Sequence, residues 1–243
     1  MKALLQDTGE RIIPPKEGEV SFVYERHKFT YFFATQYVEN KQVLDVGCGT
    51  GYGCKILAEK AYFVYGIDYN FDALKYCREF FSAPNICYSQ MDSNCLSFGK
   101  SSFDVAVTFQ VIEHMSDVNA FLRELKRVVK PGGYIIISTP NRPKPLRSKS
   151  VNPFHENEMD FEDFQDLMET HFTIFQVFNV QYDSNNWFRT IVQGLPIYKL
   201  GIHLKRKSPV KKIANRMLNL SKFKVTEKNC ESAMDFLAVC DNS

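Results

Sequence analysis

Apolar residues along most of the chain follow two different spacings, and segments with these spacings alternate. Short apolar runs at 42–46, 62–67, 86–89, 103–109, 134–138, 173–180 and 233–240 predict a sheet of seven strands. Between them apolar residues recur every three or four positions, as in Phe121, Leu125 and Val128, which predicts amphipathic helices. Strands alternating with helices predict an α/β fold with a doubly wound, mostly parallel sheet and helices on both faces.

Two parts of the chain stand outside this alternation. The first 19 residues contain Pro14 and Pro15 and predict an irregular arm, after which helical spacing over 20–38 predicts a covering helix. A long segment also separates the last two predicted strands. We therefore divide the chain into four parts: an N-terminal arm and cap helix (1–39), a core (40–180), an insertion expected to cover the substrate site (181–232), and the last strand of the core (233–243).

Composition excludes several classes of protein. Of 243 residues, 44% are hydrophobic and 24% charged, which is typical of a folded globular chain and excludes wholesale disorder. The net charge of +2 indicates no general attraction for nucleic acid or anionic lipid. No apolar stretch approaches the roughly 20 residues that span a bilayer, and no signal peptide is recognisable at the start. The 7 cysteines form no C-x-x-C pair. A reducing, cytoplasmic location is expected.

A glycine-rich segment, VLDVGCGTGYG at 43–53, joins the first predicted strand to a predicted helix over 55–60. Glycine permits positive φ angles and lets a ligand approach the backbone. The dinucleotide pattern G-x-G-x-x-G would need glycine at position 52, where Tyr52 stands. The carboxylate of Asp45, just before the turn, favours a ligand with a cationic group over a pyrophosphate, which it would repel.

Acidic residues also follow the second and third predicted strands. Asp68 has the spacing at which a carboxylate receives the two hydroxyls of a ribose. Met91 offers an apolar surface for a base, and Asp92 an acceptor for its exocyclic amine. A nucleoside with a positively charged tail satisfies these groups together with Asp45. S-adenosylmethionine is such a molecule.

Several motifs in this order resemble those of a known family. They are VLDVGCGTGYG, then GID at 66–68, QMD at 90–92, FDVAVTFQVIEHM at 103–115 and LKRVVKPGGYIIISTPN at 125–141. The chain resembles class I S-adenosylmethionine-dependent methyltransferases over residues 40–141, in particular the ubiquinone-biosynthesis-type O-methyltransferases of the type 11 group. The resemblance implies a Rossmann-like methyltransferase fold with S-adenosylmethionine as cofactor.

The resemblance also implies which residues bind the cofactor. The amino-acid half would contact Gly47, Cys48, Gly49 and Gly51; Asp68 would hold the ribose; Asp92 and Ser93 would hold the adenine; Gln110 would meet the cofactor edge. Tyr69 and Met91 complete this set, and Arg11 and His27 are candidates for closing over it.

Methyl transfer to an oxygen requires removal of a proton, which a histidine can accept near neutral pH. His114 follows the fourth strand and His155 lies in the loop after the fifth, so both are expected at the carboxyl edge of the sheet. We predict His114, His155 and the adjacent Glu113 as catalytic residues. His171 and His203 are expected to be structural or exposed.

The same three residues resemble part of the E-x-x-E-H and distal-histidine set of small-RNA terminal 2′-O-methyltransferases, which use a divalent metal. Here Gln110 replaces the first glutamate of that set, and an amide is a poorer ligand for a hard cation. We therefore expect no metal.

A basic stretch at 199–224 contains no Asp or Glu. It is typical of a solvated helix face, and the alternative is a phosphate- or nucleic-acid-binding surface. Trp187 precedes it and is expected to anchor the insertion or line a substrate pocket. The predicted function is methylation of a small-molecule acceptor at oxygen. Two alternatives are a metal-assisted RNA methyltransferase of the terminal 2′-O type and a non-enzymatic cofactor-binding regulatory module.

Overall fold

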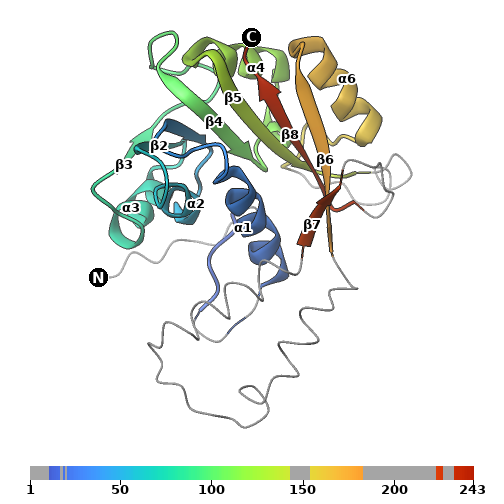
Figure 1. Ribbon diagram of the computed structural model, residues 1–243. Helices are drawn as coiled ribbons and strands as arrows, with labels where there is room; N and C mark the ends of the chain where they lie inside the picture. The colour runs from blue at the N-terminus through green and yellow to red at the C-terminus, as the bar shows by residue number, and fades with distance from the viewer. Residues whose placement is uncertain (1–10, 17–18, 20, 143–153, 183–222, 227–232) are drawn as a thin grey trace.

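The computed structural model describes residues 11–16, 19, 21–142, 154–182, 223–226 and 233–243 (Figure 1). Trp187, His203 and residues 199–222 of the basic stretch lie outside them. No helix in these ranges has the length and apolar character needed to cross a membrane.

One sheet of eight strands runs through the described structure in the order β3-β2-β1-β4-β5-β8-β6-β7 (Figure 1). Strands β1 to β5 pair in parallel. Strand β8 is antiparallel to both β5 and β6, and β7 is antiparallel to β6. The bounds are β1 (Gln42–Val46), β2 (Phe63–Asp68), β3 (Ile86–Gln90), β4 (Phe103–Phe109), β5 (Val129–Pro140), β6 (Phe175–Tyr182), β7 (Phe223–Thr226) and β8 (Asp235–Asp241).

The predicted α/β class and doubly wound sheet are confirmed, but the predicted number of seven strands is wrong. The additional strand is β7, which pairs with the end of β6. It lies inside the predicted insertion and is only four residues long, Phe223 to Thr226. Phe223 and Val225 alternate with Lys224 and Thr226, but four residues are too few to distinguish this alternation from the basic stretch that the strand overlaps.

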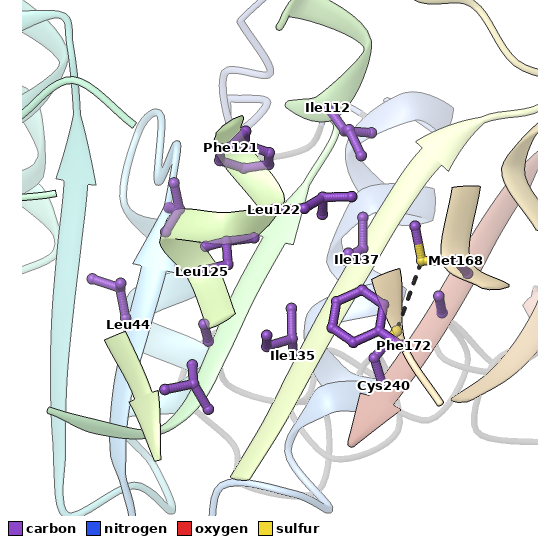
Figure 2. Close-up of a cluster of buried hydrophobic side chains, with 14 of the residues drawn as sticks. Leu44, Ile112, Phe121, Leu122, Leu125, Ile135, Ile137, Met168, Phe172 and Cys240 are labelled. Atoms are coloured by element: carbon purple, nitrogen blue, oxygen red, sulfur yellow. Dashed lines mark hydrogen bonds between the residues drawn. The ribbon is translucent and has the colours of Figure 1, made fainter. Parts of the chain in front are cut away.

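Helices cover both faces of the sheet. Helices α1 (Phe22–Ala34), α2 (Tyr52–Leu57) and α3 (Phe71–Phe80) pack on one face, against a buried set that includes Val43, Val105 and Ile136. The short η1 (Ile112–His114), α4 (Val118–Val128) and α6 (Phe161–His171) pack on the other, against Leu44 and Ile135. Figure 2 shows side chains of this second core, from Leu125 of α4 to Met168 of α6. Successive side chains of the strands thus point alternately into two separate hydrophobic cores, as expected when helices cover both faces of a sheet.

Two boundaries differ from the predictions for a local reason. Helix α2 begins at Tyr52, directly after the glycine turn, because Gly51 adopts the left-handed conformation at its N-cap. Strand β5 begins at Val129, ahead of the strand predicted from residue 134, so Pro131, Gly132 and Gly133 lie within it. The pairing register of the two strands shifts here, because Phe103 of β4 pairs with Val129 whereas Val105 pairs with Tyr134. The residues between Val129 and Tyr134 therefore form an irregularity in β5.

Candidate active site

The carboxyl ends of β1, β2, β4 and β5 lie at one edge of the sheet because these strands are parallel. At this edge the glycine turn joins β1 to α2, with φ angles of +74° at Gly47, +53° at Gly49 and +82° at Gly51. A Cβ atom at Gly47 would lie 2.4 Å from Cγ2 of Val111, whereas one at Gly49 would meet nothing within 4 Å. The turn therefore has an open side where a ligand can approach the backbone.

Asp68, at the end of β2, lies against this turn. Its carboxylate is 8% exposed and accepts hydrogen bonds from the backbone N–H groups of Gly49 (2.9 Å) and Asn70 (2.8 Å). Burial raises the pKa of Asp68, while the two backbone donors and Arg11 oppose the rise. The turn and Asp68 thus form one unit, as their predicted shared role requires. The neighbouring Tyr69 is 77% exposed beside them.

The residues predicted at the adenine follow β3 immediately. The N–H of Met91 donates to the carbonyl of Asp68 at 3.1 Å, which places the end of β3 beside the ribose candidate. Asp92 is exposed and accepts from the N–H of Asn94 at 2.8 Å, so it stabilises a turn. The Ser93 hydroxyl lies 3.4 Å from Sδ of Met115. Met91, Asp92 and Ser93 are therefore close to Asp68, and their contact with an adenine stays a prediction.

Asp45 is placed differently from the predicted ligand contact. Its side chain is fully buried; it accepts from Oη of Tyr31 at 3.2 Å and from Sγ of Cys54 at 3.1 Å. Burial raises the pKa of Asp45 to about 7. The carboxylate faces α1 and α2 behind the turn, so in this conformation it supports the turn and is not accessible to a ligand. Cys48 is also buried, and the neighbouring Cys54 thiol raises its pKa, which disfavours the nucleophilic thiolate.

His27 links three elements from its position on α1. Its Nδ1 is hydrogen-bonded to Oη of Tyr52, the first residue of α2, and its Nε2 lies 3.3 Å from the carbonyl oxygen of Phe109 at the end of β4. Burial lowers the pKa of His27 to about 4, so the imidazole is neutral at physiological pH. The structure therefore gives His27 a bracing position, and direct cofactor contact stays a prediction.

A cavity of about 510 Å³ opens where β4 and β5 end. It brings Arg11 and Gln110, predicted at the cofactor, next to the three predicted catalytic residues. Gln110 has a φ of +57°, rare for a residue with a side chain, and such conformations cluster at functional sites. The lining residues are Arg11, Ile12, Ile13, Ser21, Val23, Arg26, Gln110, Glu113, His114, Pro140 and His155.

The three predicted catalytic side chains lie together in this cavity. The Glu113 carboxylate is 2% exposed and accepts from Oγ1 of Thr139 at 3.1 Å. The centroids of the His114 and His155 rings are 4.9 Å apart. Glu113 and His155 also line a second, smaller cavity of about 240 Å³. The structure thus brings the three residues together, and their chemical roles stay predictions.

The hydrogen bonds of the two histidines indicate their tautomers. Nδ1 of His114 is 2.8 Å from the carbonyl oxygen of Phe154, which can only accept, so this nitrogen carries the proton. Nδ1 of His155 is 3.4 Å from a carboxylate oxygen of Glu158. In the neutral rings the basic lone pair is then on Nε2.

One ligand atom from each of Glu113, His114 and His155 can be chosen so that all three lie within 4.8 Å of one another. Imidazole nitrogens and a carboxylate oxygen at such spacing suit a divalent transition metal. This arrangement is relevant to the metal-assisted alternative, since it brings in His155 even though position 110 is an amide.

Two residues of the site were missed in the sequence. Nε of Arg26 on α1 forms an ion pair with Oδ2 of Asp235 on β8 at 3.1 Å. Asp235 is 1% exposed; burial raises its pKa to about 6, although Arg26 opposes the rise. The only available signal was a single acid in the apolar run AMDFLAVC, because nothing local shows that Arg26 reaches it.

Comparison with known proteins gives consistent findings. The model of the family described as Methyltransferase domain matches residues 44–137. A probable S-adenosylmethionine-dependent methyltransferase of Mycolicibacterium smegmatis is 36% identical over 165 residues, which are 67% of this chain and 63% of that protein. A ubiquinone biosynthesis O-methyltransferase of Sinorhizobium medicae is 31% identical over 134 residues, 52% of this chain and 54% of that protein.

The chain thus spans roughly half to two thirds of the length of these curated relatives. Among solved structures, a methyltransferase from Thermotoga maritima, described as S-adenosylmethionine-dependent and a possible histamine N-methyltransferase, superposes with a TM-score of 0.60. The alignment covers 90% of this chain and 92% of that one at 18% identity, which indicates a shared fold.

Proposed function

From the premise that this chain carries a class I S-adenosylmethionine-dependent methyltransferase domain, we propose that it is an enzyme methylating a small-molecule acceptor at oxygen. S-adenosylmethionine supplies an activated methyl group on a sulfonium. The observation that carries the proposal is the position of the 510 Å³ cavity, with two histidines in its wall, at the sheet edge that also bears the glycine turn and Asp68.

We assign the cofactor and the acceptor to different residues according to their positions. The open side of the turn at Gly49 and the carboxylate of Asp68 suit the amino-acid half and the ribose of the cofactor, respectively. Gln110, which follows the end of β4, lines the cavity that we assign to the acceptor. Orientation of an acceptor behind the methyl group is the main contribution a protein makes to such a displacement.

The proton of the acceptor hydroxyl would pass to Nε2 of His114 or His155. The backbone carbonyl of Phe154 and the carboxylate of Glu158 hold the two Nδ1–H groups, which leaves each basic lone pair on Nε2. Glu113, buried beside them, would stabilise the imidazolium that forms. An oxygen acceptor is favoured because an alcohol, unlike a neutral amine, needs a base at this point.

Calorimetric titration with S-adenosylmethionine tests the cofactor half. We expect binding to the wild type and a loss of affinity of at least about tenfold in Asp68→Ala, because hydrogen bonds to a charged group contribute roughly 1.5–3 kcal/mol each. Asp72→Ala, on the exposed first turn of α3, is the matched control and should bind normally. Absence of binding to the wild type would refute the proposal.

Transfer of a labelled methyl group from the cofactor to a metabolite extract tests the activity. A labelled small molecule carrying a methyl ether is the expected product. Cofactor binding without turnover on any extract would instead support the regulatory module.

One alternative function is a metal-assisted RNA methyltransferase. It is supported by the close approach of Glu113, His114 and His155, whose ligand atoms could hold a divalent metal. This alternative predicts transfer to RNA and loss of activity with EDTA, restored by a divalent metal. Activity on small molecules that is indifferent to EDTA would remove it.

A further inference from the structure

The acceptor cavity has a cationic and apolar wall that the proposed proton transfer does not use. This wall is formed by α1 and by the segment that precedes it, and it faces the two histidines. Its apolar members are Ile12, Ile13 and Val23, and its cations are Arg11 and Arg26. Among the described residues of the lining, Glu113 is the one that carries a carboxylate; it is buried, and it accepts a hydrogen bond from Thr139.

Arg26 is held in place from behind. Its Nε lies 3.1 Å from Oδ2 of Asp235, and the Arg26 side chain is only 19% exposed. Asp235 is fixed in the sheet, paired with Pro140 of β5 on one side and Val180 of β6 on the other. A guanidinium has five N–H donors in one plane, and this ion pair engages its Nε edge. The sheet thus places a rigid, planar cation on the wall of the cavity.

Such a cation suits a carboxylate. Guanidinium and carboxylate groups match in geometry, and a preorganised side chain loses little entropy when it binds one. Asp235 offsets part of the positive charge, which leaves Arg26 as a directional donor set more than as a general attractor. Arg11, on the preceding segment, adds a second positive charge to the same cavity.

Apolar side chains share this wall with the cation. Val23 of the lining is 47% exposed, and Ile12 and Ile13 are half-buried. Exposed apolar side chains in the wall of a cavity are typical of a surface that binds an apolar ligand.

We infer that the methyl acceptor is an amphiphilic acid, with a carboxylate that binds Arg26 and an apolar body along Ile12, Ile13 and Val23. This inference deepens the proposed function and rests on it. Arg26 is then the residue that determines specificity for the anionic group, and Asp235 is its positioning residue.

Two probes of equal length separate a carboxylate from its neutral counterpart: decanoate and decanamide. Each is titrated calorimetrically into the full chain at low ionic strength, with and without S-adenosylhomocysteine. We expect decanoate to bind at least about tenfold more tightly than decanamide to the wild type, and Arg26→Gln to remove this preference. Lys28→Gln, which removes a charge from the same helix outside the cavity lining, should retain it.

Arg26→Gln leaves the buried Asp235 without its cation and can weaken folding. The double variant Arg26→Gln/Asp235→Asn removes both charges and should fold, bind S-adenosylhomocysteine and still lack the carboxylate preference. Equal binding of the two probes to the wild type overturns the inference, as does an equal loss of preference in Lys28→Gln. Failure of the proposed function is seen separately, as absence of S-adenosylhomocysteine binding, while the probe titrations without it still decide the inference.

Discussion

Replacing Asp45 with asparagine removes the buried carboxylate behind the glycine turn and keeps an oxygen that can accept from Tyr31. Burial raises the pKa of this carboxyl group from 3.8 to about 7. Each pKa unit corresponds to about 1.4 kcal/mol, so the ionised form is disfavoured in the native state by on the order of 4 kcal/mol.

The sign follows from which state holds the proton. Between pH 4 and about 7 native Asp45 keeps its proton while the unfolded chain releases it, so this group makes the wild type less stable as pH rises through that range. Asp45→Asn lacks the effect. We therefore expect the free energy of unfolding of the variant, relative to the wild type, to increase by a few kcal/mol from pH 4.5 to pH 8, on the scale of that pKa shift.

Urea unfolding followed by circular dichroism at several pH values measures this difference. His27 and Asp235 also titrate in the range, but both are present in either protein and cancel in the comparison. Asp72→Asn, whose native carboxylate is exposed on α3, should follow the wild type at every pH. Parallel curves for Asp45→Asn and the wild type would refute the reasoning, because the carboxylate would then be ionised at no cost in the native state.

Three further predictions concern the surroundings of the site. A methyl group at Gly53 would lie 2.0 Å from Cζ of the packed Tyr31 ring, so Gly53→Ala should lower the free energy of unfolding, measured in urea, by about 1–3 kcal/mol. Gly99→Ala is the control, because no atom would lie nearer than 3.5 Å to its methyl group; equal urea midpoints for the two variants would contradict the close packing at Gly53. The lowered pKa of His27 means that stability falls as pH decreases from about 6.5 to about 4. His27→Gln should weaken that acid sensitivity in melting experiments, and an unchanged acid limb would count against a buried neutral imidazole. His114→Ala and His155→Ala should each slow methyl transfer roughly a hundredfold if that residue is the base, with cofactor affinity within about twofold of wild type. Wild-type rates in both variants would show that neither histidine is the base.

The part of the site near β1 and β2 could be predicted because its signals are local. The glycine turn and Asp68 follow consecutive strands, and parallel pairing alone brings the ends of those strands together. The direction of Asp45 was predicted less well. Strand side chains alternate, so Asp45 shares the face of Val43, which α1 and α2 cover. That outcome depends on which helix packs where, and the sequence pattern around Asp45 does not contain it.

The far wall of the cavity depends on contacts between distant parts of the chain. Arg26 near the beginning meets Asp235 near the end, and each looks ordinary in its own segment. His155 was predicted from its position after β5, yet its closeness to His114 also needs the loop to return across η1. The backbone N–H groups of Glu156 and Asn157 donate to the carbonyl of Glu113 and hold this part of the chain against η1. Such backbone hydrogen bonds cannot be predicted from the residue types.

Strand direction reverses between β5 and β8, and this reversal determines which end of the last strand reaches the cavity. Because β8 is antiparallel to β5, its first residue, Asp235, pairs with Pro140 at the carboxyl end of β5. A parallel last strand would bring its final residue to this edge instead. The reversal therefore lets a residue near the end of the chain hold Arg26, which lies near its beginning.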